Sequence, residues 1–181
     1  MKLADVIQFT AGPNASRVKE QYKEAVLYTV QDLEEDLLQK EGESHIPFPK
    51  DASNFTKQGD LVVSMMKRRA AIVTAANEGK LLNSNFVKGQ WNESLADPWY
   101  LCYWLNESED VKRQRQQCMV LSPYTAREMG ELDIQLPPLP MQQKIGQLYQ
   151  KMKTIEALLE KQKDAWQTMT LQTIKNVLKG D

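Results

Sequence analysis

The chain has 181 residues, a length that suits one globular domain with an extension, and its 41% hydrophobic and 26% charged residues exclude a disordered chain. A net charge of −1 argues against a uniformly basic nucleic-acid-binding coat, although it leaves a local basic face open. The two cysteines fit no disulfide framework, and no apolar signal segment or membrane-spanning window is present, so we expect a cytoplasmic protein.

The first third of the chain predicts little regular structure. Residues 1–30 have the pattern of irregular or extended chain. Thr29 and Asp32 suit the two positions of a capping box, which predicts a short acidic helix through Lys40 that closes at Gly42. Two prolines make residues 44–58 a loop.

Three apolar runs then predict strands. They cover residues 61–66, 70–75 and 81–87, and residues 77–79 supply a turn between the last two. Short links favour antiparallel neighbours, so the prediction is an α+β fold whose head contains a mixed β-sheet with short helices.

Two later segments share one pattern for starting a helix. Asp97-Pro98 places an N-cap residue before a proline, whose missing N–H costs nothing in the first helical turn. Ser122-Pro123 repeats the pattern and predicts a short helix that ends near Gly130. Residues 132–136 are expected to be extended.

The tail combines a proline-rich strap with a long helical pattern. We divide the chain into a head of residues 1–135, a strap of residues 136–141 that cannot be helical, and a coiled-coil helix of residues 142–181. About 38 helical residues form a rod of roughly 55 Å. Apolar residues recur at steps of three and four, which predicts a dimerisation seam: Ile145, Leu148, Met152, Ile155, Leu159, Trp166 and Met169.

Catalytic and metal-binding patterns are missing from the sequence. The single histidine, His45, lies in a proline-flanked loop without an evident acidic or nucleophilic partner. Asp97-Pro98-Trp99-Tyr100 is similar to the loop with which amino-methyltransferases hold a flipped base. It lacks the second proline and an accompanying glycine-rich cofactor loop, so a helix cap followed by core aromatic residues is the favoured interpretation. No catalytic residue, metal ligand or cofactor is predicted in this chain.

Basic residues gather in three places and suggest contacts with DNA phosphates, while asparagine can read base edges. A solvated surface is the alternative interpretation, because long basic side chains are common in loops. The candidate DNA-binding residues are Arg17, Lys67, Arg68, Arg69, Asn85, Lys88, Lys112 and Arg113.

The order of these segments resembles a known family. Gly59-Asp60 precedes an apolar strand, and Asp97-Pro98-Trp99 opens an aromatic helix. Glu131 to Pro140 (ELDIQLPPLP) then leads into the long helix. The sequence is similar to the DNA-specificity (S) subunits of type I restriction-modification systems, in which a target recognition domain ends in such a strap and a coiled-coil helix. The resemblance is good over residues 59–178 and weaker before them.

The resemblance implies a non-catalytic subunit that recognises one half of a bipartite DNA target. The family's usual chain has two recognition domains and two helices, whereas this sequence supplies one of each. We therefore expect a two-fold dimer of a half-length subunit, with an inverted-repeat target and heads about one and a half DNA turns apart. The expected partners are double-stranded DNA, methyltransferase (M) subunits that bind S-adenosylmethionine, and a nuclease (R) subunit where one exists.

Three alternatives remain open at this stage. The chain could need a different S chain to complete it. It could be a coiled-coil interaction protein whose head binds protein rather than DNA. It could also be a stand-alone methyltransferase, which would have to bind S-adenosylmethionine itself.

Overall fold

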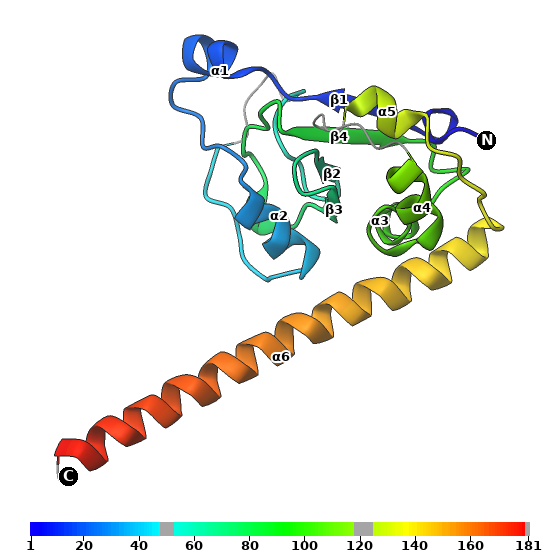
Figure 1. Cartoon of the computed structure of the whole chain (residues 1–181). Helices are drawn as coiled ribbons and strands as arrows, with labels where there is room; N and C mark the ends of the chain where they lie inside the picture. The colour runs from blue at the N-terminus through cyan, green and yellow to red at the C-terminus, as the bar shows by residue number, and fades with distance from the viewer. Residues whose placement is uncertain (48–52, 118–124, 180–181) are drawn as a thin grey trace.

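A four-stranded antiparallel sheet lies at the centre of the head (Figure 1). The computed structural model describes residues 1–47, 53–117 and 125–179. The sheet order is β1-β4-β2-β3, with every neighbouring pair antiparallel. The two inner strands, β4 and β2, are hydrogen-bonded to a neighbour on each side, and all four residues of β2 are buried. The strands are β1 (Ile7–Ala11), β2 (Leu61–Ser64), β3 (Arg69–Ile72) and β4 (Phe86–Trp91).

The predicted α+β class is confirmed, and so are the strands at β2 and β3. Parallel pairing in the described residues is limited to an isolated bridge between Leu27 and Leu81, outside the four strands. The third predicted strand is displaced, because β4 begins only at Phe86. A turn at Asn83, whose carbonyl accepts from the Phe86 N–H, separates Leu81 from the sheet.

Two short helices flank the first half of the sheet. Helix α1 (Ala15–Gln21) was not predicted, although Asn14 caps it by accepting from the Arg17 N–H. Helix α2 (Val30–Leu37) begins with the predicted capping box of Thr29 and Asp32. It ends at Leu37 rather than Lys40, and Gln39, not Gly42, adopts the left-handed conformation that reverses the chain.

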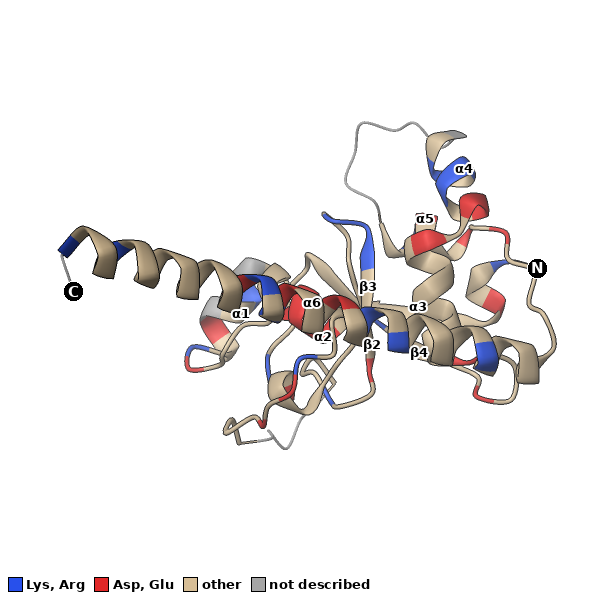
Figure 2. Cartoon of the chain, turned by 90° about the horizontal axis from the view of Figure 1, so that it is seen from below, with Lys and Arg blue, Asp and Glu red and all other residues tan. Residues whose placement is uncertain are grey.

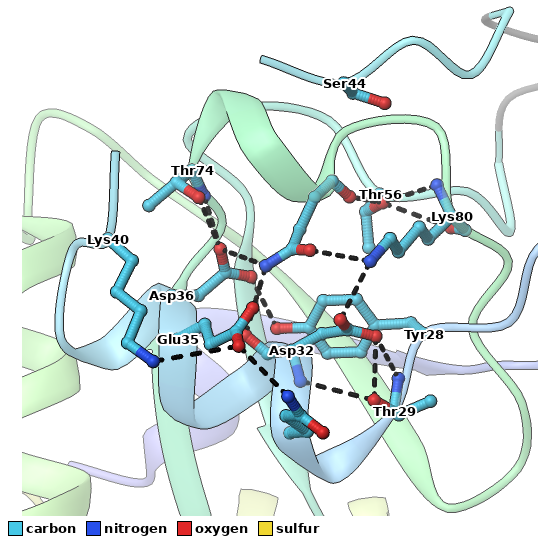
Figure 3. A network of polar contacts seen from close by, with 12 residues as sticks. Tyr28, Thr29, Asp32, Glu35, Asp36, Lys40, Ser44, Thr56, Thr74 and Lys80 are labelled. Carbon is cyan, nitrogen blue, oxygen red and sulfur yellow. Dashed lines mark hydrogen bonds and ion pairs between the residues drawn. The ribbon is translucent and has the colours of Figure 1, made fainter. Parts of the chain in front are cut away.

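A buried polar network fastens α2 to the sheet (Figure 3). The Asp36 carboxylate is fully buried and accepts hydrogen bonds from the Tyr28 hydroxyl at 2.6 Å, from the Thr74 N–H and hydroxyl, and from Asn77. Lys80 Nζ lies 2.8 Å from both Asp32 Oδ1 and Asn77 Oδ1. Asn77 belongs to the short helix η2 (Ala75–Asn77), so the network joins residues 28–36 to residues 74–80.

Three helices cover the rest of the head: α3 (Pro98–Glu107), α4 (Glu109–Gln117) and α5 (Ala126–Gly130). The Asp97 cap of α3 is confirmed, because Asp97 Oδ1 accepts from the Tyr100 N–H at 2.8 Å. The Ser122-Pro123 start predicted for α5 lies outside the described residues. The helix itself is capped by Thr125, paired with Glu128, and ends at Gly130 as predicted.

The N-terminus pairs with the segment that leads into the last helix. The short helix η1 (Leu3–Asp5) begins two residues after the N-terminus, and its Leu3 N–H donates to the Leu132 carbonyl at 2.8 Å. The Ile134 N–H donates to the Met1 carbonyl at 3.0 Å. The extended segment predicted after Gly130 is therefore held in place by the first residues of the chain.

Helix α6 (Leu139–Lys179) contains 41 residues and spans about 60 Å. It begins inside the strap, which corrects the prediction that residues 136–141 are not helical. Pro140 fits because the first helical turn has no partner for its missing N–H. The helix packs under α3 and then continues past α2, beyond the head (Figure 1). Within the described ranges, no helix is long and apolar enough to cross a membrane.

Candidate functional site

The turn between β2 and β3 presents three consecutive basic residues at its tip (Figure 2). Lys67 and Arg68 are exposed, and Arg68 has a positive φ of 54° that tightens the turn. Arg69 Nη1 lies 2.8 Å from Glu34 Oε2. The predicted hairpin position of this cluster is confirmed, and all three of its cations are exposed.

Helix α4 brings a second predicted cluster against this turn (Figure 2). Arg115 Nη1 donates to the Arg68 carbonyl at 3.1 Å, which fixes α4 beside the hairpin. Asn85 lies at the base of the same turn, because its carbonyl accepts from the Met65 N–H at 2.8 Å. Six of the predicted DNA-binding residues lie on this turn, at its base or on the helix joined to it, and we call them together the hairpin surface: Lys67, Arg68, Arg69, Asn85, Lys112 and Arg113.

Acidic neighbours balance part of this charge. Lys112 Nζ lies 2.8 Å from Glu109 Oε1, and Arg113 pairs with Asp110, both one turn apart on α4. Lys112 lowers the pKa of the exposed Glu109 through this contact. Exposed ion pairs contribute little to stability because water screens them, so a phosphate group can replace the carboxylates at little cost.

Two predicted DNA-binding residues lie elsewhere. Arg17 is exposed on α1, at the opposite end of β1 from α5 (Figure 1). Lys88 is directed into the head surface, where its Nζ donates to the Phe55 carbonyl at 3.0 Å and pairs with Asp60 at 3.3 Å. The sequence pattern identified these cations but not their neighbours.

The segment that is similar to a base-flipping loop has a structural role in this head. Asp97-Pro98-Trp99-Tyr100 forms the cap and first turn of α3, as the helix-cap interpretation predicted. Cys102 is fully buried, and burial raises the pKa of its thiol, so a reactive thiolate is disfavoured. His45 is an exposed loop residue. Among the described residues no cluster of histidine, cysteine or acidic side chains could hold a metal ion.

Helix α6 is attached to the head through a stripe of four buried residues, Gln142, Gly146, Tyr149 and Lys153. We call this the head-facing stripe. The Gln142 side chain accepts from the Asp97 N–H at 3.1 Å and donates to the carbonyls of Leu95 and Pro137. One amide therefore joins the start of α6, the strap and the cap of α3.

Gly146 allows the closest approach between α6 and α3. A Cβ at this position would lie 2.4 Å from Asp97 Oδ1, 2.8 Å from the Trp99 Cβ and 3.0 Å from the Tyr100 nitrogen. Those distances are too short for any side chain, so glycine is needed where the first turn of α3 rests on the long helix.

Tyr149 and Lys153 close the contact one and two turns further along. The Tyr149 hydroxyl accepts from Asn106 Nδ2 at 3.1 Å and lies 3.3 Å from Glu107 Oε1. Lys153 Nζ lies 5.3 Å from the Tyr149 ring centre, within the range of a cation–π contact, and 2.9 Å from Glu156 Oε2. Polar and aromatic contacts together fix the direction of α6 against α3.

The predicted seam lies on a different face of the helix. At 3.6 residues per turn, its mean direction is roughly 125° from the head-facing stripe. Ile145 packs against the head core. The other six seam side chains are exposed in the single chain: Leu148, Met152, Ile155, Leu159, Trp166 and Met169.

The apolar pattern identified the seam but missed the head-facing stripe. The stripe has the same spacing of four, three and four residues, which was the available signal. It contains a glutamine, a glycine, a tyrosine and a lysine, so a search for apolar periodicity does not detect it.

Comparison with solved structures reveals the same arrangement. The chain is similar to the HsdS subunit from Thermoanaerobacter tengcongensis, with a TM-score of 0.56 and 16% identity, over 89% of this chain and 38% of that one. It is also similar to a chain of a type I R-M system studied for its assembly and conformational transition. That TM-score is 0.62 at 14% identity, over 96% of this chain and 42% of that one.

The sequence itself gives no comparable match. No protein-family model matches it, and no curated protein does. The chain spans about two fifths of the length of the two solved chains. Over most of its length, it has the fold of HsdS specificity subunits.

Proposed function

We propose that this chain is a non-catalytic DNA-specificity subunit of a type I restriction-modification system. The observation that supports the proposal best is the combination of a sheet-based head and a long helix that aligns with HsdS chains over 89–96% of this sequence. The buried cysteine and the capping role of the Asp97-Pro98 turn are in keeping with recognition rather than catalysis.

The hairpin surface is the part of the head that we assign to DNA. Exposed lysine and arginine side chains bind backbone phosphates, and Asn85 at the base of the turn can contact a base edge. A narrow turn such as the β2–β3 hairpin also fits the ~12 Å width of the major groove. The head would thus read one half of a split target.

The exposed seam is proposed to pair two copies into an antiparallel two-fold dimer. The α6 residues that the head buries lie between 142 and 153, so the helical stretch between the heads is shorter than the whole rod. With the two helices fully overlapped, about 23 residues, or roughly 35 Å, would separate the attachment points. That distance corresponds to about one DNA turn, rather than the one and a half turns expected from the full length.

Methyltransferase subunits are the proposed partners of this dimer. They would bring S-adenosylmethionine and the base-flipping chemistry, and a nuclease subunit could join them. Co-purification with the methyltransferase, followed by mapping of methylated sites, tests the assignment. Inverted-repeat half-sites in cells that carry this S chain alone are expected, and asymmetric half-sites would contradict the homodimer.

Removing charge from the hairpin should weaken DNA binding. Replacing both Lys67 and Arg68 with alanine is expected to lower affinity at ~0.1 M salt by about tenfold and to reduce the salt slope by about 1–2, because fewer counterions are released. Fluorescence anisotropy with the methyltransferase present measures both quantities.

The matched control removes the same number of positive charges from the long helix instead of the hairpin. Lys161→Ala with Lys179→Ala alters exposed residues away from the seam and should leave both quantities unchanged. An equal loss of DNA affinity in the two double variants would show that the hairpin cations contribute only a non-specific attraction between the protein and DNA. Absence of salt-dependent binding in the unmodified complex would favour the alternative function, a coiled-coil interaction protein without a DNA role.

Charges in the seam should separate the dimer. Ile155→Glu with Leu159→Glu places unpaired carboxylates in the proposed interface, where desolvation is costly. Light scattering should then show a monomer of 20.8 kDa, whereas Lys161→Glu, on another face of the helix, should leave the dimer intact. A dimer mass that survives the double change would place the interface elsewhere.

A further inference from the structure

The outer edge of β3 is covered by side chains rather than by another strand. β3 is the last strand in the sheet order, and Figure 1 draws it on the side of the sheet that faces α6. The Asn106 amide pairs with Ala70 as a neighbouring strand would. Its Oδ1 accepts from the Ala70 N–H at 2.8 Å, and its Nδ2 donates to the Ala70 carbonyl at 2.9 Å. Two residues further along β3, Gln39 Nε2 donates to the Ile72 carbonyl at 3.3 Å. Side-chain amides therefore bind backbone groups that a fifth strand would otherwise bind.

Each of these two amides is also bound by a residue of α6. Asn106 Nδ2 donates a second hydrogen bond to the Tyr149 hydroxyl at 3.1 Å, and Gln150 Nε2 donates to Gln39 Oε1 at 3.4 Å. Tyr149 is buried and Asn106 is partly buried, so water has limited access to the shorter of these contacts. Because an amide nitrogen has two hydrogens, Asn106 can serve both partners at once. One side chain thus joins β3 to the long helix.

Covering a sheet edge does not by itself require the long helix. Charged side chains, a proline or a bulge protect the edge strands of many proteins. Here the covering amides are contacted by two consecutive residues of α6, Tyr149 and Gln150. Ala70 also directly follows the three cations of the β2–β3 turn. The helix is therefore connected, through Asn106, to the end of the turn that we assign to DNA.

We propose that Asn106 is a positioning residue that holds the β2–β3 turn at a fixed place and angle relative to α6. It acts through Ala70 on one side and through Tyr149 on the other. This inference rests on the proposed function, because a bipartite target requires both turns of a dimer to meet their half-sites at one spacing and one rotation. A turn that moves relative to α6 would still contact one half-site, but it would bind the second half-site at a lower effective concentration.

Two DNA duplexes distinguish positioning from a purely structural role. One contains both mapped half-sites at their natural spacing, and the other contains a single half-site. With the methyltransferase present, Asn106→Leu should lower the affinity for the two-site duplex by about tenfold and that for the single site by about twofold at most. The single site is still bound because β3 stays paired with β2 along its other edge. A purely structural role would reduce the fraction of folded protein and lower both affinities equally.

A second variant keeps the test valid if Asn106→Leu does not fold. Tyr149→Phe removes only the hydroxyl, so the ring can keep its contacts with Trp99 and Tyr103. The pairing of Asn106 with Ala70 also remains. The affinity for the single site should therefore be unchanged, while that for the two-site duplex should fall by about threefold. In dimers that contain one labelled chain, the distance between a spin label on the β2–β3 turn and one on α6 should be more widely distributed in both variants.

Asn92→Leu is the matched control, because Asn92 is an exposed residue of the head whose side chain accepts from the Ser94 N–H at 3.0 Å. It should leave both affinities and the distance distribution unchanged. Equal losses on the two duplexes, with an unchanged distance distribution, would overturn the positioning role and leave the DNA-specificity function standing. Absence of DNA binding by the unmodified complex would overturn the proposed function and this inference together.

Discussion

Asp36→Ala is expected to lower the free energy of unfolding by about 3–5 kcal/mol. The substitution removes the carboxylate that accepts several buried hydrogen bonds, and the donors would be left without an acceptor. The Tyr28 hydroxyl, the Thr74 N–H and hydroxyl, and Asn77 Nδ2 would all lose an acceptor inside the head. Urea unfolding followed by circular dichroism measures the change. Glu35→Ala, next in sequence but in a surface ion pair with Lys40, is the control and should cost less than about 1 kcal/mol.

The same carboxylate should give the head a specific pH dependence. Burial raises the pKa of Asp36 above the 3.8 of an exposed aspartate, against the opposing effect of the hydrogen bonds that it accepts. The folded state therefore binds this proton more tightly than the unfolded state does. Its contribution to stability decreases as the pH rises from about 4 through the raised pKa.

Asp36→Asn separates this effect from the hydrogen bonds. Asparagine keeps an acceptor oxygen but does not titrate, so the unmodified protein should lose stability relative to the variant as the pH increases through that window. An unfolding free energy difference that is constant with pH would show that Asp36 has the same pKa in both states.

Gly146→Ala should destabilise the protein by about 1–3 kcal/mol, which is the opposite of the usual effect in a helix. Replacing glycine with alanine inside a helix ordinarily stabilises it by about 1 kcal/mol. Here the added methyl group would overlap Asp97 Oδ1 and the Trp99 Cβ, so α6 must move away from α3. Gly146→Leu should increase the loss and separate the helix from the head.

The measurement again is urea unfolding, combined with the distance between a spin label on the head and one on α6. Gln147→Ala, at the adjacent exposed position, serves as the control and should be neutral within about 0.5 kcal/mol. A more stable Gly146→Ala variant would mean that α3 and α6 are less closely packed than the structure indicates.

Local sequence rules predicted the elements that depend on neighbouring residues. The caps at Thr29 and Asp97 and the strands at Leu61 and Arg69 follow from side chains a few positions apart. The start of β4 was misplaced because apolar pairs at residues 81–82 and 86–87 flank three polar residues, and the pattern was taken as one strand. Pairing with β1 across the sheet, which no local pattern encodes, decides which of them form the strand.

The sequence predicted only those parts of the candidate site whose residues are close together in the chain. Lys67 to Arg69 stand out in sequence as a hairpin tip, and the seam follows from its spacing. The approach of α4 to the hairpin includes a hydrogen bond from Arg115 to the Arg68 carbonyl, 47 residues apart in the sequence. The crossing of α3 and α6 depends on Gly146, whose importance is evident only when Asp97 and Trp99 are seen against it.

The residues of α6 that the head buries lie near the start of the helix, so the length of the remaining helix could change while the buried contact stayed the same. A heptad inserted after Lys153 would preserve the phase of the seam and lengthen each helix by about 10 Å. In a fully overlapped dimer the two heads would then lie about 10 Å further apart, which corresponds to about three base pairs. Spacer length would therefore evolve in large, discrete steps, while the half-site sequences stayed the same.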